Sequence, residues 1–145
     1  MLGVKRMTYR PDSKDRKIIY LLVKLTELGL EVEEENLHKL IYRAQKRGVR
    51  MGLEFEVMNS EGLVFSYELA ERLERLANLG YIKRYMIVER VYDELYSYLY
   101  KVSEKGIALI KRAGVAQRDK KILDDIVERI KERIEKVKSK RKVRS

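Results

Sequence analysis

Side chains that could carry out chemistry are few in this sequence of 145 residues. His38 is the single histidine and there is no cysteine, which excludes a thiolate nucleophile, a thiolate metal site and a disulfide. Asp124, Asp125 and Glu128 lie close together, but on a charged amphipathic segment such carboxylates are typical of a solvated face. The sequence contains no phosphate-binding glycine-rich loop, HExxH or GxSxG motif. We therefore expect no enzyme, no metal and no cofactor, and we expect His38 to be an ordinary surface or packed histidine.

Positive charge is the chemistry that the sequence does offer, and it lies at the two ends. The chain holds 33 Lys and Arg against 23 Asp and Glu, a net charge of +10. Residues 1–17 hold six basic and two acidic residues, and residues 131–145 hold eight and two, so the rest of the chain is neutral. Basic ends attract polyanions, or they remain solvated tails that aid solubility. The sequence leaves both interpretations open.

The composition fits one domain of ordinary size. Hydrophobic residues, 45% of the chain, can supply a core, and charged residues, 39%, can cover it. The longest strongly apolar run, residues 18–23, is far shorter than a bilayer span, and the N-terminus lacks the apolar core of a signal peptide. We expect a cytoplasmic protein with no membrane contact. Abundant Lys, Arg and Glu with scarce Asn, Gln and Cys are typical of hyperthermophile proteins.

Helical periodicity dominates the first half of the chain. Apolar residues at helical spacing, each run followed by a glycine, predict helices at residues 13–28, 34–47 and 67–79. Asp12 or Ser13 is expected to cap the first helix, and Ser66 the third.

Between and after these helices the period changes to two. Residues 53–57 alternate apolar residues with glutamate, which predicts a half-buried strand, and residues 63–65 can return as a second one. Residues 81–88 and 95–102 predict a hairpin, and six of the ten tyrosines lie between positions 81 and 100. Such tyrosines can stack on single-stranded bases, but packing on the core side of the hairpin is the favoured interpretation.

Two further helices complete the chain. Ser103 is expected to cap a short one, and a long amphipathic helix follows. Its apolar stripe consists of Ile122, Ile126, Ile130, Ile134 and Val137. Because an exposed row of this length is unusual on a monomer, it predicts a homodimer with this helix in the interface. The alternative is that the helix folds back on the first helix of its own chain.

The order of helix, helix, strand, helix, hairpin, helix, helix is the plan of a winged helix-turn-helix domain. The segments "LERLANLGYI" and "YKVSEKGIALI" resemble the third helix, wing and following helix of PadR- and MarR-type regulators. Those proteins commonly carry Tyr-x-Leu-Thr-x-x-Gly, and Tyr100, Val102, Ser103 and Gly106 take the corresponding places here. The resemblance implies a mostly α fold with a small β component, a winged helix with a long C-terminal helix, and DNA binding in transcription regulation.

A second resemblance extends further towards the N-terminus. "LHKLIYRAQKRG" and "LEFEVMNSEGLVFSYELAERLERLANLGYI" are similar to YwgA-like and Panacea-like proteins. The Lys-Leu-hydrophobic-Tyr element of those proteins matches residues 39–42. Their Gly-Pro-x-Ser element is represented by Gly62 and Ser66, without the proline and with wider spacing. This resemblance implies a protein-interaction module, antitoxin-like or chaperone-like, that does not bind DNA.

These observations predict four segments along the chain. They are a basic arm at residues 1–12, a winged-helix domain at 13–114, a long C-terminal helix at 115–138 and a basic tail at 139–145.

The third predicted helix bears on how nucleic acid would be bound. On a helical wheel, its outward face holds Tyr67, Glu68, Glu71, Glu74, Arg75 and Asn78. Three acids against one base oppose docking between the phosphate walls of a major groove. The face is otherwise a solvated one, with pairs four residues apart at Glu68–Arg72 and Glu71–Arg75.

We therefore expect a transcription-regulator-like protein that contacts mainly the phosphate backbone of duplex DNA, through the wing and the basic ends. The candidate nucleic-acid-binding residues are Tyr67, Arg75, Asn78, Lys83, Arg84, Arg90, Lys138, Lys140, Arg141, Lys142 and Arg144. One alternative is a module that binds a protein partner through the acidic face of the third helix or the inserted strand. Another is a structural homodimer with no ligand.

Overall fold

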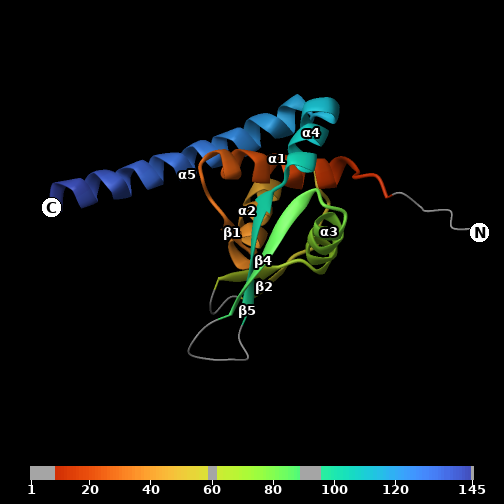
Figure 1. Ribbon diagram of the computed structural model, residues 1–145, viewed down its shortest axis with the longest axis horizontal. Coiled ribbons are helices and arrows are strands. Elements are labelled where there is room, and N and C mark those ends of the chain that lie inside the picture. The colour runs from red at the N-terminus through yellow and green to blue at the C-terminus, as the bar shows by residue number, and fades with distance from the viewer. Residues whose placement is uncertain (1–8, 59–61, 89–95, 145) are drawn as a thin grey trace, which may run out of the picture.

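The structure, a computed structural model, describes residues 9–58, 62–88 and 96–144; of these, only the backbone is described at residues 88, 96 and 141–144. Within these residues the chain is mostly helical with a small β component, as predicted (Figure 1). The elements are α1 (Ser13–Glu27), β1 (Val32–Glu33), α2 (Glu34–Lys46), β2 (Glu56–Met58), β3 (Leu63–Phe65), α3 (Tyr67–Asn78), β4 (Ile82–Val88), β5 (Tyr96–Val102), α4 (Glu104–Ala113) and α5 (Gln117–Arg144). No helix in the described ranges has the length and hydrophobicity needed to cross a bilayer.

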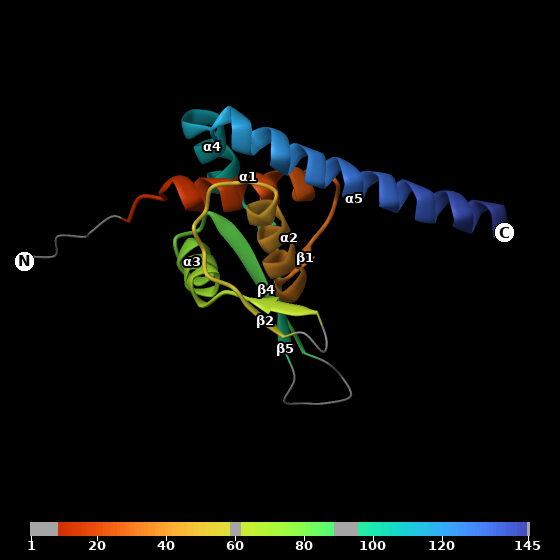
Figure 2. The ribbon, with the colours of Figure 1, turned by 180° about the vertical axis from the view of Figure 1, so that it is seen from behind.

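The strands form two small antiparallel sheets. β4 and β5 pair from Ile82↔Val102 to Val88↔Tyr96, and β1 pairs with the other edge of β5, giving the order β1-β5-β4. β2 and β3 form a separate hairpin, which lies at the lower end of the body beside the lower parts of β4 and β5 (Figure 2). The sequence did not predict β1, because two residues are too few to show a period.

The hydrophobic core is centred on α1. This helix lies between α4 and α5 on one side and α2, α3 and the three-stranded sheet on the other (Figure 1). Ile18, Ile19, Leu21 and Leu22 are all 0% exposed, because a helix covered on two opposite sides has almost no surface left for solvent.

Helix caps formed where the sequence predicted them. Asp12 accepts a hydrogen bond from the Asp15 N–H in a capping box, Ser66 accepts one from the Leu69 N–H, and Ser103 caps α4. Gly106, in the first turn of α4, is there for space: a Cβ would lie 2.3 Å from the Tyr81 carbonyl oxygen. α4 therefore packs closely on the end of the hairpin.

The predicted strand at residues 53–57 is displaced towards the C-terminus. Leu53 is buried, but its N–H and carbonyl bond to the side-chain amide of Gln45, at 2.9 and 2.8 Å, rather than to a strand. The ladder begins at Glu56, and Val57 is 47% exposed although its alternation predicted burial. The side chain of Gln45 satisfies the backbone that a neighbouring strand was expected to satisfy.

α5 extends further and packs differently from the prediction. It runs to Arg144, so the basic residues after 138 continue the helix instead of forming a separate tail. Ile126 is 6% exposed in the core, and Ile122 and Ile130 pack against the same core. The first half of the helix therefore folds back on its own chain, which is the arrangement that the sequence left open. The C-terminal part of α5 projects beyond the body (Figure 1). Of the stripe residues nearest that end, Ile134 is half-buried and Val137 is 51% exposed.

Candidate functional site

The outward face of α3 is acidic, as the sequence predicted. Glu71, Glu74 and Asn78 are exposed, and Tyr67 is 67% exposed with its ring edge-to-face against Phe65. The guanidinium of Arg75 lies 4.5 Å from the centre of the Tyr9 ring. This cation–π contact occupies Arg75 within the chain.

Arg72 is held still more firmly. Its guanidinium bonds to Asp12, Asp15 and Glu68, all at 2.8–2.9 Å, which confirms the predicted Glu68–Arg72 pair. The pKa of Glu68 is lowered: burial acts in the opposite direction, but the hydrogen bonds from Arg72 and Lys14 outweigh it. Arg72 is thus engaged within the chain, whereas Arg75 is exposed beside Glu71 and Glu74, so the exposed charges of this face are two acids and one base.

The β4–β5 hairpin presents positive charge on its outer face. Lys83 is exposed and lies directly opposite Lys101 in the antiparallel register. Two like charges in this position repel each other, and an anion bound between them would relieve the repulsion. Lys101 was not among the candidate nucleic-acid-binding residues predicted from the sequence, although the register of the hairpin pairs it with Lys83.

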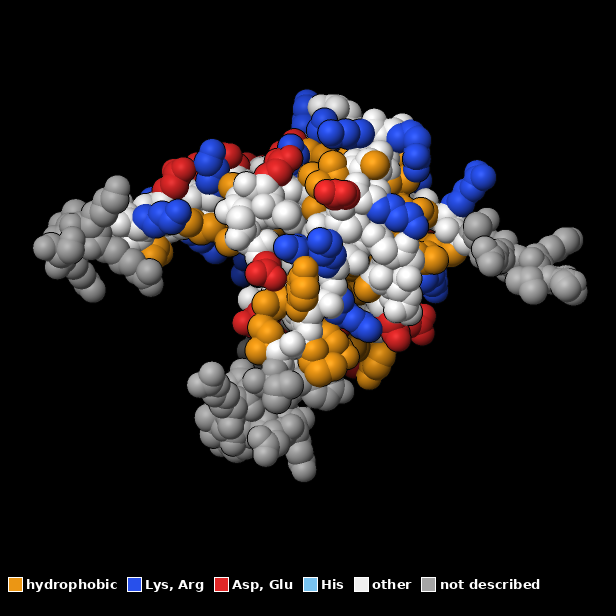
Figure 3. Space-filling view, viewed as in Figure 1, with side chains coloured by type: hydrophobic (Ala, Val, Ile, Leu, Met, Phe, Trp, Pro, Cys, Tyr) orange, Lys and Arg blue, Asp and Glu red, His pale blue; other side chains and the backbone are white. Residues whose placement is uncertain are grey.

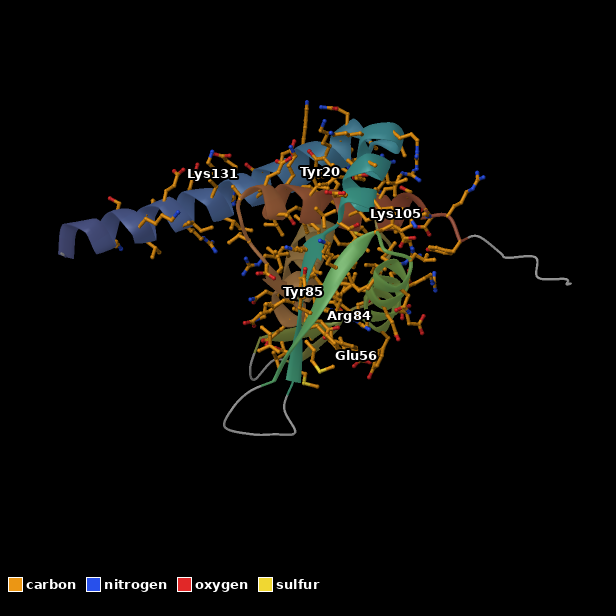
Figure 4. The ribbon with its side chains drawn as sticks, viewed as in Figure 1. Tyr20, Glu56, Arg84, Tyr85, Lys105 and Lys131 are labelled. Atoms are coloured by element: carbon orange, nitrogen blue, oxygen red, sulfur yellow. The ribbon has the colours of Figure 1, made fainter. Side chains whose placement is uncertain are left out.

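Several cations on the hairpin and the start of α4 contact aromatic rings, including Lys101, whose Nζ lies 5.6 Å from the centre of the Tyr85 ring. Arg84, labelled in Figure 4, is half-buried with its guanidinium 4.5 Å from the centre of the Tyr98 ring. Lys105 lies over the Tyr81 ring and donates to the Leu79 carbonyl at 2.7 Å. Arg90 lies outside the described residues. Tyr100 is 1% exposed, which supports core packing for this tyrosine.

The end of α5 carries a dense run of positive charge. Residues 136–144 include six Lys and Arg and no acid, on about 13 Å of helix. Lys138 and Lys140 are exposed, while the side chains of Arg141, Lys142 and Arg144 lie outside the described part. Lys136, which is also exposed, belongs to this run, although the candidates predicted from the sequence began at Lys138.

His38 is a packed histidine, as predicted. It is 1% exposed, its ring stacks on Phe65 at 4.7 Å, and its Nδ1 accepts a hydrogen bond from the Ser66 N–H at 3.1 Å. Burial lowers the pKa of His38 to about 4, so the ring is neutral at physiological pH. Within the described ranges, no three His, Asp or Glu residues are grouped so as to hold a metal ion.

The distribution of exposed apolar side chains is uneven. Among the described residues, seven large exposed apolar side chains gather on the β2–β3 hairpin, the start of α3 and the outer half of β4, at the lower end of the body in Figure 3. They are Val57, Met58, Phe65, Tyr67, Tyr85, Met86 and Ile87. Apolar surface of this kind, concentrated in one region, is typical of a site that contacts another molecule.

Comparisons with known proteins were made at three levels. Neither protein-family models, nor curated protein sequences, nor solved structures give a match to this chain. The resemblances to PadR- and MarR-type regulators and to YwgA-like and Panacea-like proteins therefore stay predictions.

Proposed function

We propose that this chain is a winged-helix protein that binds duplex DNA mainly through the phosphate backbone. The order of α1, β1, α2, α3 and a two-stranded hairpin supports the fold, as does the pairing of β1 with the second strand of the hairpin. The β2–β3 hairpin is then an insertion between the second and third helices of this plan.

The observation that carries the proposal is the basic end of α5. Six Lys and Arg without an acid belong to the end of this helix, which projects from the body, where a phosphate backbone could approach it (Figure 1). Lys83 and Lys101 on the wing supply a second cationic site. The glutamates of α3 oppose deep insertion into a major groove, so contact with phosphates is favoured over reading of bases.

A salt titration of binding to a random-sequence duplex tests this function. If about six phosphates are neutralised, the slope of log affinity against log salt is roughly −5. Single-stranded DNA and RNA of equal length serve as comparisons. Phosphate contacts alone discriminate only weakly among these nucleic acids, so their affinities should be similar. Absence of binding at about 50 mM salt, or affinity indifferent to salt, would contradict the proposal.

A second candidate function is favoured by the exposed apolar side chains. Met58 and Tyr67, which are 61% and 67% exposed, lie at the inserted hairpin and the start of α3. Phosphate contacts do not require exposed apolar side chains, whereas a protein partner would bury these two. We propose on this ground that the chain also serves as a protein-interaction module.

We further propose a homodimer built on the projecting part of α5. Ile134 and Val137 continue the stripe whose first half packs on the chain's own core. Two copies related by a two-fold axis would pack these residues against each other. The groove of about 520 Å³ beside Ile130, lined also by Leu30 and Leu40, lies next to this segment and offers further apolar contact.

A further inference from the structure

A cavity of about 340 Å³ lies between the start of α2 and the β2–β3 hairpin. Its walls include the apolar side chains of Met58, Leu63 and Phe65. This volume accommodates a large apolar side chain, and it is within the range of small-ligand sites. The cavity is distinct from the proposed DNA contacts on the wing and on α5.

His38 gives this cavity an unused hydrogen-bond donor. Its Nδ1 accepts from the Ser66 N–H, so the neutral ring carries its proton on Nε2. Nε2 is buried and has no hydrogen-bond partner among the described residues, although His38 lines the cavity. A buried donor without an acceptor is unfavourable, and an occupant that supplied an acceptor would remove the deficit.

The rim of the cavity is negatively charged. Glu34, Glu35 and Glu56 line it, and no lysine or arginine does so among the described residues. Glu34 accepts a weak hydrogen bond from Tyr100 at 3.4 Å, and Glu35 pairs with Lys39 at 3.4 Å, on a partly exposed surface. The side chain of Glu56 makes no hydrogen bond or ion pair with any described residue, so its charge is available to a cation (Figure 4).

We propose that this cavity docks a segment of another protein that inserts an apolar side chain and places lysine or arginine over the glutamates. The inference rests on the second candidate function, protein interaction, and names the site and the chemistry of the partner. The apolar side chain of the partner contacts Met58 and Phe65, and the neighbouring lysine or arginine pairs with Glu35 and Glu56. The partner segment also supplies the hydrogen-bond acceptor for His38 Nε2–H.

Two observations favour a protein segment over other occupants. Tyr67, on the wall of the cavity, is 67% exposed, so the apolar surface reaches further than an occupant of 340 Å³ would cover. The three glutamates repel nucleic acid and anionic membranes, so neither polyanion fits the site. A basic, apolar peptide satisfies both the cavity and its rim.

The test is selection of a random 12-residue peptide library on the intact protein, followed by affinity measurement for the most enriched peptide. The expected peptides share one large apolar residue flanked by lysine or arginine. Met58→Glu should weaken binding by roughly tenfold or more, because it puts a charge on the apolar wall. Glu56→Lys should weaken binding by reversing the charge of the rim.

Ala116→Glu is the control: it also adds one carboxylate, but exposed Ala116 lies just before α5 and does not line the cavity. It should leave peptide affinity unchanged within about twofold, and circular dichroism should show both variants folded. Enriched peptides that bind Met58→Glu and Ala116→Glu equally would overturn this site while leaving protein interaction standing. A library that yields no binder, or yields acidic peptides, would overturn the site; complete absence of binders would also remove the second function. DNA affinity, measured in parallel, should be the same for Met58→Glu and the wild type.

Discussion

The carboxylate of Asp119, in the first turn of α5, lies 3.0 Å from the ammonium of Lys17 on α1, and the two side chains are 1% and 7% exposed. Asp119 also accepts a hydrogen bond from the Arg50 N–H at 3.2 Å, and Lys17 donates to the Arg50 carbonyl. Burial acts against the charge on Asp119, but the bonds from Lys17 and Arg50 outweigh it and hold the pKa of the carboxyl below its ordinary value. This pair fixes the start of α5 to the core helix.

Asp119→Ala is therefore expected to lower the free energy of unfolding by about 3 kcal/mol, because it leaves the ammonium of Lys17 buried without a counter-ion. Urea denaturation measures the change. The matched control is Asp125→Ala. Asp125 lies on α5, as Asp119 does, but its ion pair with Arg47 is exposed, so its loss should have little effect. Equal effects of the two substitutions would show that burial of the first pair does not matter.

The burial of His38 predicts a loss of stability in mild acid. Its pKa is about 4 in the folded chain and about 6.5 when unfolded, so the unfolded state binds the proton more readily. Stability is complete above pH 6.5 and falls as the pH is lowered towards 4, by up to about 3 kcal/mol. His38→Asn, which keeps an acceptor for the Ser66 N–H but does not titrate, should lack this slope in denaturation measured between pH 7 and 4. A wild-type slope no steeper than that of the variant would contradict the assignment.

Substitutions can distinguish contact with the phosphate backbone from reading of the bases. Lys83→Ala with Lys101→Ala, and deletion of residues 138–145, should weaken all sequences about equally. Each lost phosphate contact should reduce the salt slope by about one. Lys46→Ala, on α2, is the control for loss of one positive charge elsewhere.

Base reading by α3 makes the opposite prediction. Arg75→Ala and Asn78→Ala would then cost about 1–3 kcal/mol on a preferred site and little on random DNA. We expect small effects from both, because Arg75 lies over Tyr9 and the exposed neighbours Glu71 and Glu74 are acidic. A strong sequence-selective loss at Arg75, with a silent deletion, would show that α3 is the reading element.

The homodimer is tested by Ile134→Glu with Val137→Glu, which should give a folded monomer by analytical ultracentrifugation. Ile126→Glu should instead unfold the chain, since Ile126 is 6% exposed in its own core. A wild-type protein that sediments as a monomer at all concentrations would rule out the dimer.

Features set by neighbouring residues could be predicted from the sequence. The three first helices end within two residues of their predicted limits, and the caps at Asp12, Ser66 and Ser103 formed as expected. Capping and helical periodicity involve residues at most four positions apart, so a single segment contains the whole signal. The acidic character of the α3 surface followed from the same spacing.

Features set by distant residues required the tertiary structure. β1 exists because Val32 pairs with Tyr100, and the orientation of His38 depends on Ser66, 28 positions later. The isoleucine stripe of α5 predicted an apolar contact, but only packing decided that Ile126 contacts its own core. Amphipathic periodicity determines which face of a helix is buried, whereas the surface that covers this face is chosen by the topology of the whole chain.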